Sequence, residues 1–453
     1  MAAEEVDVVV IGLGPGGENA AGLLAEAGLR VVAVESRLVG GECPYWGCIP
    51  SKMMIRAADL LAEGRRIPGM AGQSTVSPSW APVAKRIREE ATDTWNDKVA
   101  ADRLVGKGAE LVRGHGTVTG PSEVTVGDRV FTARRGIVLA AGTSPAIPPI
   151  DGLAGTPFWT NHEAIETDRL PASLVVLGGG AIGAELSQMF ARFDVDVTVV
   201  EASDRLVAIE EPESGELLAK VFEESGVKVH TGVGAKSVRH DAAGFTLTLA
   251  DGSTVQGEQL LVATGRRTNL ATLGVEALGI DPKARAVPVD DRLRAAPGVW
   301  ALGDITGKGA FTHISMYQSE IVVRDILGQE GPAADYRALP RVTFTDPEIG
   351  AVGLTEAQAR DQGLEVATGI VQLPEVTRGW IHRAEGFIKL VADTDRGILV
   401  GATTAGPAGG EMIGALAVAV AAEVPVQTLR HMIYAYPTFH RGILQALSDL
   451  DAG

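Results

Sequence analysis

Apolar runs of strand length alternate with helix-compatible stretches along the chain, which is the pattern of an α/β fold. A first strand is predicted at residues 6–11, a helix at 18–27 and a second strand at 30–34. The same order returns later, with strands at residues 174–177 and 196–200 on either side of a helix. Because each first strand runs directly into a glycine-rich turn, the sequence predicts the same strand–turn–helix–strand unit twice.

Both glycine-rich turns match the dinucleotide-binding pattern G-x-G-x-x-G. The first glycine permits the tight turn, the second lets the backbone approach a pyrophosphate, and the third lets the helix pack closely on the strand. The six glycines are Gly12, Gly14 and Gly17 in the first copy, and Gly178, Gly180 and Gly183 in the second. In each copy an acidic residue, Glu35 or Glu201, follows eighteen positions after the last glycine, where it would accept hydrogen bonds from a ribose. The repeated spacing predicts two dinucleotide sites.

Two dinucleotide sites in one chain imply an electron path between a mobile nicotinamide nucleotide and a resident flavin. At the second site Glu201 favours NADH, because the 2′-phosphate of NADPH would face a carboxylate, and nearby Arg205 leaves NADPH as the alternative. Two further strand-to-glycine turns end at Gly142 and Gly265. Asp304 also follows a predicted strand, at the edge where open α/β sheets bind ligands; its alternative role is a turn cap.

The only two cysteines, Cys43 and Cys48, lie five positions apart. A structural disulfide closing so small a loop would stabilise the fold by only ~2 kcal/mol. A zinc site would need four ligands, and the nearest histidine in the sequence is His115, so we predict no metal site. A redox pair remains. A helix predicted to open at residues 50–52 places Cys48 near its N-terminus, where a thiolate is stabilised.

The chain carries 40 Lys and Arg against 57 Asp and Glu, a net charge of −17. This excess of negative charge argues against a nucleic-acid or anionic-membrane partner. The N-terminus has no secretory pattern, and the most apolar helical stretch, at residues 412–422, is too short to span a membrane. We therefore expect a soluble, cytoplasmic protein.

Residues 40–52, with the sequence GGECPYWGCIPSK, resemble the redox signature of the class I pyridine nucleotide-disulfide oxidoreductases, the flavoprotein disulfide reductases. This family includes dihydrolipoamide dehydrogenase, glutathione reductase, mycothione reductase and mercuric reductase. The resemblance continues through residues 178–185, 303–304, 344–353 and 386–391, and so covers the chain nearly from end to end.

The resemblance implies two Rossmann-like domains, one for FAD and one for the nicotinamide nucleotide, plus a C-terminal α+β dimerisation domain. The FAD domain is expected at residues 1–149 and 270–330, with the NAD(P) domain at 150–269 between its two pieces. The dimerisation domain is expected at residues 338–453. A homodimer with a shared active site follows as the natural unit.

The resemblance also implies roles for individual residues. Cys48 would lie beside the flavin, and Cys43 would be the interchange thiol that meets the acceptor. Lys52 would lie near the flavin and pair with Glu185. Trp46 is expected to shield the cysteines or pack locally, with stacking on a substrate as the alternative. Further positions matched to cofactor binding are Gly116, Gly142, Thr143, Gly265, Asp304, Phe311, Thr312 and His313.

Among these positions, Gly116 matches the turn that holds the adenine, and Asp304 matches the carboxylate that binds the ribityl chain. The helix start at residues 311–313 matches the pyrimidine end of the flavin. His313 is expected to serve the geometry of this helix start rather than catalysis.

The resemblance breaks near the C-terminus. Disulfide-reducing members carry His-Pro-Thr and then a glutamate four residues after the proline, and the histidine shuttles protons at the partner's interchange thiol. Here Tyr436 and Arg441 occupy the two positions. A tyrosine, with a pKa of about 10, is a poor proton acceptor, and such general acid–base help is worth ~10²–10⁴-fold. Ordinary disulfide turnover is expected to be slow unless His440, one helical turn on, replaces the histidine rather than lying idle on the surface.

Mercuric reductases also carry tyrosine near this position, which draws the resemblance towards metal-ion reduction. They need a C-terminal cysteine pair, and residues 448–453 contain none, so mercuric reduction is not expected. A second departure is Glu42, where the family usually has threonine close to FAD. A carboxylate facing a pyrophosphate is unfavourable, and we expect Glu42 to point away or to bind a cation.

Three hypotheses follow. The leading one is an NADH-dependent oxidoreductase that passes electrons through FAD and the Cys43–Cys48 disulfide to a small-molecule acceptor such as a quinone, a metal ion or a small oxidant. The alternative is a dihydrolipoamide dehydrogenase-like reductase of one low-molecular-weight disulfide, which the intact cysteine pair favours. The third and least favoured is a dehydrogenase subunit of a multienzyme assembly, since no lipoyl-like domain or low-complexity linker is present.

Overall fold

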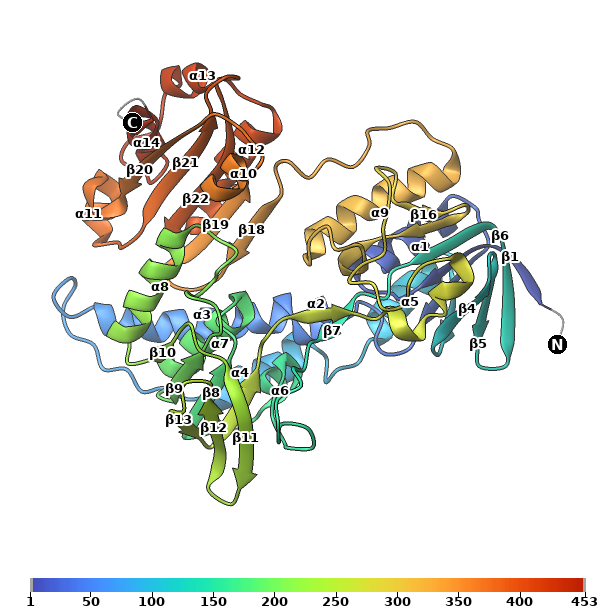
Figure 1. Ribbon diagram of the computed structural model, residues 1–453, viewed down its shortest axis with the longest axis horizontal. Helices are drawn as coiled ribbons and strands as arrows, with labels where there is room; N and C mark the ends of the chain where they lie inside the picture. The colour runs from blue at the N-terminus through green and yellow to red at the C-terminus, as the bar shows by residue number, and fades with distance from the viewer. Residues whose placement is uncertain (1–2, 451–453) are drawn as a thin grey trace.

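The computed structural model describes residues 3–450 and arranges them in three regions around the long helix α3, Cys48–Arg66 (Figure 1). Residues 1–2, the first of the predicted FAD domain, and residues 451–453, the last of the predicted dimerisation domain, lie outside the described part. The first region is an eight-stranded sheet of order β16-β17-β6-β1-β2-β3, which β5 and β4 extend from β6. Its strands are β1 Glu4–Ile11, β2 Val31–Glu35, β3 Glu110–Arg113, β4 Gly116–Gly120, β5 Glu123–Val126, β6 Arg129–Leu139, β16 Arg294–Ala296 and β17 Val299–Ala301.

Strand β1 is parallel to β2 and β6, and its side chains are buried on both faces of the sheet. Val9 and Ile11 join one hydrophobic cluster, and Val8 and Val10 join another, as a parallel sheet covered on both sides requires. The helices α1 (Pro15–Glu26) and α9 (Thr312–Leu327) pack together over the second face. The predicted helix at 18–27 begins earlier, at Pro15, because proline suits the first turn of a helix.

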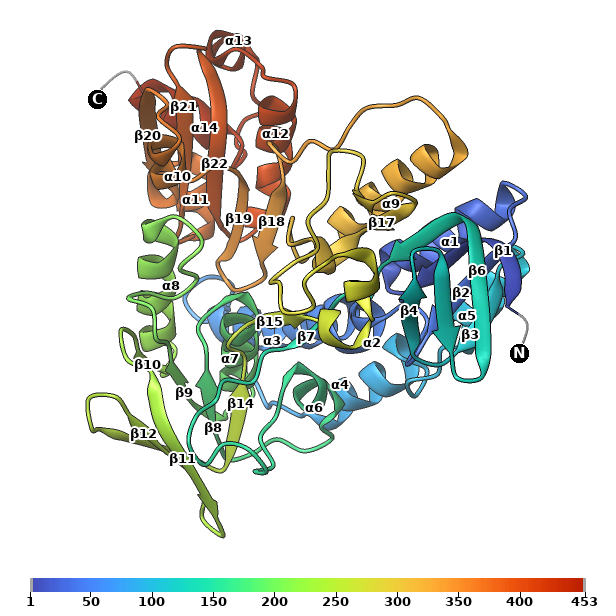
Figure 2. The same cartoon turned by 45° about the vertical axis from the view of Figure 1, so that its right-hand side comes forward.

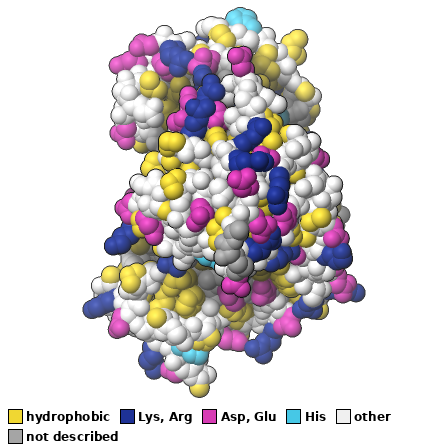
Figure 3. Space-filling view, turned by 90° about the vertical axis from the view of Figure 1, so that its right-hand side faces the viewer, with side chains coloured by type: hydrophobic (Ala, Val, Ile, Leu, Met, Phe, Trp, Pro, Cys, Tyr) yellow, Lys and Arg dark blue, Asp and Glu magenta, His cyan; other side chains and the backbone are white. Residues whose placement is uncertain are grey.

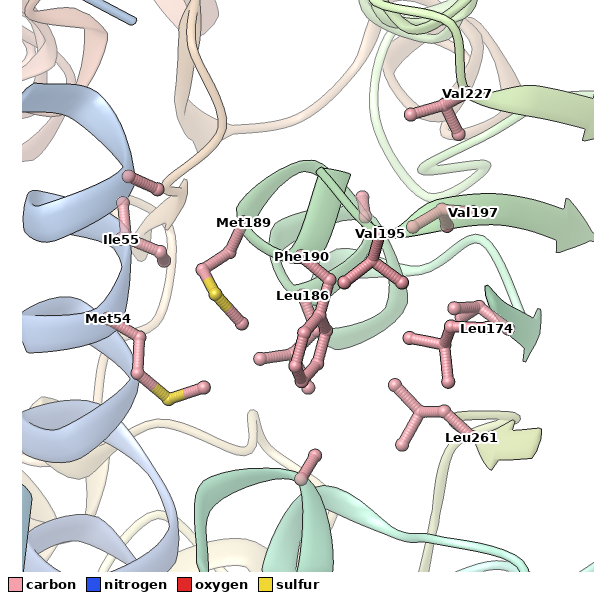
Figure 4. Close-up of a cluster of buried hydrophobic side chains, with 14 of the residues drawn as sticks. Met54, Ile55, Leu174, Leu186, Met189, Phe190, Val195, Val197, Val227 and Leu261 are labelled. Carbon is pink, nitrogen blue, oxygen red and sulfur yellow. The ribbon is translucent and has the colours of Figure 1, made fainter. Parts of the chain in front are cut away.

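The second region holds a parallel sheet of order β10-β9-β8-β14. Its strands are β8 Ser173–Leu177, β9 Asp196–Val200, β10 Lys228–His230 and β14 Gln259–Val262, and beside it β11 Ala235–Asp241, β12 Gly244–Leu249 and β13 Thr254–Gly257 form an antiparallel sheet. The helices of this region are α7 Ala181–Arg192 and α8 Pro212–Glu224. Met54 and Ile55 of α3 pack against α7, beside Met189 and Phe190 (Figure 4). The helix that begins at Cys48 is therefore anchored on the second nucleotide-binding unit.

The third region is an antiparallel sheet of order β18-β19-β22-β21-β20 at the C-terminal end of the molecule (Figure 1). Its strands are β18 Pro340–Thr343, β19 Glu348–Gly353, β20 Val366–Gln372, β21 Phe387–Asp393 and β22 Ile398–Gly406. Its helices are α10 Glu356–Asp361, α11 Thr377–His382, α12 Gly409–Ala421, α13 Val426–His431 and α14 Arg441–Asp449.

A two-stranded ribbon, β7 (Thr143–Pro145) with β15 (Arg266–Thr268), connects the first two regions (Figure 2). Several short helices complete the first two regions, and some of them carry residues of the site. They are α2 Glu42–Trp46, α4 Ala81–Arg86, α5 Lys98–Gly106 and α6 Asn161–Glu166, with a 3-10 turn at Gly303–Thr306.

Acidic and basic side chains are interspersed on the face of the first region (Figure 3). Arg129 of β6 pairs with Glu4 of β1 and Glu110 of β3, and Arg134 pairs with Asp7. The charges on this part of the sheet are therefore paired across strands.

Candidate functional site

One connected cavity of about 2050 Å³ runs between the three regions. Both glycine-rich turns and both cysteines line it. In addition, its wall includes the start of α9, the loop after β18 and the ribbon β7–β15. The cavity thus connects the two glycine-rich turns, the cysteine pair and the start of α9.

The two glycine-rich turns have the same internal packing. A Cβ atom on Gly17 would lie 2.1 Å from the carbonyl oxygen of Gly12, and one on Gly183 would lie 1.9 Å from that of Gly178. These glycines are therefore required by close contact between helix and turn. At Gly14 and Gly180, by contrast, an added Cβ would meet no protein atom within 4 Å. No protein contact demands glycine at the middle position, and the open space there suits the backbone approach of a pyrophosphate.

The acidic residues of the two copies also make the same contacts. Glu35 accepts hydrogen bonds from the backbone N–H groups of Leu13 (2.7 Å) and Arg37 (2.8 Å). Glu201 accepts them from Gly179 (2.5 Å) and Ser203 (2.6 Å), at the equivalent positions. Each carboxylate is fixed at the rim of its turn and keeps lone pairs for ribose hydroxyls.

Cys43 lies on the single turn of α2, and Cys48 is the first residue of α3. The structure holds both as thiols, the reduced form of a redox pair, in hydrogen-bonding contact with each other. Thr312 Oγ1 lies 3.4 Å from Cys48 Sγ. The hydrogen bond from Cys43, helped by Thr312 and the charge of Lys52, outweighs burial and lowers the pKa of Cys48 to about 6. The same contact and burial raise the pKa of Cys43 well above its usual range.

Labelling of the reduced protein with iodoacetamide should show this difference. Because the thiolate is the nucleophile, the rate at which Cys48 is alkylated is expected to rise with a midpoint near pH 6, about two and a half units below an ordinary thiol. Thr312→Val keeps the side-chain shape and removes the hydroxyl, and should move this midpoint upwards. Peptide mass spectrometry measures both rates, and an unchanged midpoint in the variant would show that Thr312 does not stabilise the thiolate.

A partly buried ion pair links the three regions near the cysteines; the Lys52 side chain is 35% exposed and that of Glu185 is 7% exposed. Lys52 Nζ of α3 lies 2.7 Å from Glu185 Oε2 of α7, the pair that the family resemblance implies. The other oxygen of Glu185 accepts the backbone N–H of Phe344 at 2.9 Å. Lys52 also lies over the Phe344 ring, 4.6 Å from its centroid. Glu185 therefore fixes the Lys52 ammonium in position within the cavity wall.

Comparison with known proteins identifies this arrangement. Residues 6–319 match the pyridine nucleotide-disulphide oxidoreductase family, and residues 339–447 match the dimerisation domain of the same family. The chain is a pyridine nucleotide-disulphide oxidoreductase.

Curated relatives of two kinds are similarly close. A mercuric reductase of Acidithiobacillus ferrooxidans is 33% identical over 97% of this chain and 82% of its own length. A dihydrolipoyl dehydrogenase of Chlorobaculum tepidum is 32% identical over 99% of this chain and 97% of its own. Among solved structures, LpdA of Mycobacterium tuberculosis matches with a TM-score of 0.86 at 27% identity, covering 99% of this chain and 100% of LpdA. The Cu(II) complex of the disulfide reductase RclA of Escherichia coli matches with 0.86 at 26% identity, covering 99% of both chains.

As a member of this family, the oxidoreductase uses FAD and a nicotinamide nucleotide, and its C-terminal region is a dimerisation domain. The open approach at Gly14 and at Gly180 fits two dinucleotides in the cavity. No helix among residues 3–450 combines the length and apolar character that crossing a membrane requires.

The eight further positions that the sequence matched to cofactor binding all line the oxidoreductase cavity. These are Gly116, Gly142, Thr143, Gly265, Asp304, Phe311, Thr312 and His313. His313 stacks on Phe311 with ring centroids 5.1 Å apart, and its Nε2 lies 2.9 Å from the carbonyl oxygen of Pro340. Its contacts are therefore those of packing at the start of α9.

A chain of polar contacts connects Asp304 to the redox turn. Thr143 donates to Asp304 (2.7 Å) and accepts from Arg266 (2.7 Å), and Arg266 lies 3.4 Å from Glu42. Glu42 also lies 3.5 Å from Arg37. Glu42 was expected to point away or to bind a cation; it lines the cavity and is paired with these two arginine side chains.

The predicted proton-transfer candidates lie away from the cavity within one chain. Tyr436 is 69% exposed, with its hydroxyl 3.4 Å from Thr377 Oγ1 of α11. His440 lies immediately before α14. Neither is among the described residues that line the cavity.

Sequence reasoning missed Arg266 and the helix α6, whose Asn161 and His162 both contact Glu42. A signal for α6 was present, because Thr160 and Glu163 form a capping box in the sequence and in the structure. Nothing in the sequence indicated that this helix would contact the redox turn.

Proposed function

We propose that this oxidoreductase transfers electrons from NADH, through FAD and the Cys43–Cys48 disulfide, to a quinone, a metal ion or a small oxidant. The proposal rests on a combination of two features. The environment of the cysteine pair stabilises Cys48 as a thiolate, and Tyr436 and Arg441 stand in place of the family's proton-transfer pair. An acceptor that needs no proton from the protein at the interchange thiol suits this set of residues.

When bound, FAD supplies the chemistry that takes a hydride from the nicotinamide and transfers two electrons to a disulfide. Cys48 is proposed to face the flavin and Cys43 the acceptor. Lys52, held by Glu185, places a positive charge beside the reacting groups. Thr312 stabilises the Cys48 thiolate by its hydroxyl contact. Tyr436 and His440 are proposed to approach the partner's site in a homodimer, because within one chain they lie outside the cavity.

NADH is the proposed donor. Both oxygens of Glu201 are turned to the rim of the second site by backbone N–H groups. Arg205, the residue that could favour NADPH, donates to the carbonyl of Ala208 (2.9 Å) and pairs with Asp204 (3.2 Å). It is not among the described residues that line the cavity.

The domain division that we propose is unchanged. The FAD domain comprises residues 1–149 and 270–330, the NAD(P) domain residues 150–269, and the dimerisation domain residues 338–453.

The similarity to mercuric reductases and to RclA, whose Cu(II) complex is a solved structure, supports a metal-ion acceptor. The second candidate is a reductase of one specific disulfide, as in the dihydrolipoyl dehydrogenases. It is favoured by the protonated Cys43 thiol held against Cys48, an arrangement that a direct reductase of quinones would not need.

NADH oxidation with lipoamide, small disulfides, quinones and Cu(II) as acceptors tests the proposal. Cys43→Ser should reduce any disulfide turnover to background, because disulfide exchange requires the interchange thiol. Loss of quinone turnover in the same variant would support the route through the cysteine pair, whereas quinone turnover that survives would show that quinones take electrons directly from the flavin. Rapid wild-type turnover of one disulfide, with quinones and Cu(II) inert, would contradict the leading proposal and establish the second candidate.

A further inference from the structure

The helix α2, which carries Cys43, is a single turn of five residues, Glu42–Trp46. Glycines flank it at both ends, and neither glycine has a side chain that could cap the helix. A helix this short does not hold its own conformation in water. The geometry of the interchange thiol therefore depends on contacts made by the rest of the turn.

Helix α6 contacts both ends of this turn. At the first residue, His162 Nε2 lies 2.8 Å from Glu42 Oε1, and Asn161 Nδ2 lies 3.3 Å from Oε2. At the last residue, Asn161 donates to the carbonyl oxygen of Trp46 at 2.7 Å. The Trp46 indole donates to Glu166 at 2.6 Å and stacks on the His162 ring at 4.5 Å. We call Asn161, His162 and Glu166 the α6 latch.

The contacts of Arg37 define the protonation pattern of this cluster. Its guanidinium lies 3.2 Å from His162 Nδ1 and 4.6 Å from the centre of the Trp46 ring. A guanidinium can only donate, so Nδ1 accepts and the ring proton is on Nε2, directed at Glu42. Burial opposes the charge on Glu42, but this hydrogen bond and the charge of Arg266 outweigh burial and lower the pKa of Glu42. The carboxylate is therefore ionised and fully partnered.

The latch belongs to the second nucleotide-binding unit. The capping box of Thr160 and Glu163 fixes the start of α6, and Ala164 and Ile165 are buried. Just before the helix, Trp159 exchanges backbone hydrogen bonds with β14: its N–H donates to Leu260 (2.7 Å) and its carbonyl accepts from Val262 (2.8 Å). The segment that leads into α6 is therefore hydrogen-bonded to the edge strand β14 of the parallel sheet. Through α6, the redox turn is connected to that sheet.

We propose that Glu42 and the α6 latch are positioning residues for Cys43. They hold the redox turn so that the Cys43 thiol faces Cys48, and they thereby favour the disulfide over the dithiol. A disulfide demands narrow distances and angles, and a turn free to move would meet them less often. This inference rests on the proposed redox role of the cysteine pair but not on the identity of the acceptor.

The equilibrium with dithiothreitol measures this directly. When oxidised dithiothreitol reacts with the reduced protein, its own S–S bond breaks and the Cys43–Cys48 bond forms. Two electrons and two protons pass from the protein thiols to dithiothreitol. Trapping with iodoacetamide at a series of dithiothreitol ratios gives the fraction of protein in each state.

Four variants make the test specific. Glu42→Gln keeps the side-chain shape, and His162→Ala removes the stack and the hydrogen bond. Glu166→Ala acts at the other end of the turn, on an exposed residue. His240→Ala is the matched control, an exposed histidine on β11 of the same region. His162→Ala is expected to lower the equilibrium constant for disulfide formation about tenfold, the effect of losing a hydrogen bond to a charged group.

Glu42→Gln and Glu166→Ala should shift the equilibrium in the same direction, and His240→Ala should leave it unchanged. A merely structural role would lower the thermal midpoint of FAD-loaded protein without changing the dithiothreitol equilibrium. Unchanged equilibria in Glu42→Gln and Glu166→Ala would therefore overturn the inference even if His162→Ala failed to fold. Absence of turnover with every acceptor would contradict the proposed function and leave this equilibrium measurable.

Discussion

A Gly183→Ala variant is expected to fold with normal FAD content and to bind NADH about 100-fold more weakly than the wild-type protein. The added Cβ would lie 1.9 Å from the carbonyl oxygen of Gly178 and 3.0 Å from its carbonyl carbon. Both atoms are backbone, so no flexible side chain can move aside. Helix α7 must instead shift away from the turn, and its N-terminal N–H groups shift with it from the place where phosphates bind.

The first copy supplies the reciprocal experiment. Gly17→Ala places a Cβ 2.1 Å from the carbonyl oxygen of Gly12 and should reduce FAD content. Gly106→Ala is the matched control, because a Cβ at this helical glycine meets no atom within 4 Å. Stopped-flow reduction by NADH and flavin content after purification separate the two effects. Equal loss of FAD in both variants would show that the two turns do not bind separate nucleotides.

A Lys389→Met variant is expected to lose about 3–5 kcal/mol of its free energy of unfolding, because it leaves buried carboxylates without their cation. Lys389 of β21 is 5% exposed and lies 3.0 Å from Glu211, 2.8 Å from Glu213 and 3.1 Å from Glu356. Glu211 itself is only 2% exposed. Burial opposes the charge on Lys389, but the hydrogen bonds to Glu213 and Glu211 outweigh it and raise its pKa.

The pH dependence of this loss has a defined sign. A raised lysine pKa gives a stabilisation that is complete below the pKa of the unfolded chain and is lost only as pH rises through the folded value. Neutral and mildly acidic conditions therefore show the full effect in the wild-type protein. Lys220→Met is the control. Lys220 lies on α8 and forms an exposed ion pair with Glu385, so its replacement should change the urea midpoint little. A Lys389→Met midpoint equal to that of Lys220→Met would contradict the prediction.

The sequence predicted those features that depend on neighbouring residues. Glycine spacing and strand patterns placed both nucleotide turns, because the tight turn, the phosphate approach and the helix start are all local. The resemblance predicted the fold class, and the family match confirms it. The signal at residues 50–52 placed Cys48 at a helix N-terminus, and α3 begins at Cys48.

Contacts between distant segments were not predictable in the same way. Glu42 was recognised as unusual, but apart from nearby Arg37 its partners come from α6 and β15, more than 100 residues away. Lys389 is one of ten lysines in the sequence, and only the structure shows that it is buried beside Glu211 and Glu213. Tyr436 and His440 were predicted from their places in the sequence alone, and within one chain neither is among the described residues that line the cavity.

The duplicated hydrogen bonds of Glu35 and Glu201 carry a consequence for protein engineering. In each copy the carboxylate that would recognise the ribose also closes its own turn, at Leu13 in one copy and at Gly179 in the other. Replacing Glu201 to admit a 2′-phosphate would leave the Gly179 N–H without its acceptor, beside the loop that binds the nucleotide. The Glu201 side chain would both select the coenzyme and hold the turn in shape. A change of coenzyme would therefore call for a redesigned turn rather than a single substitution.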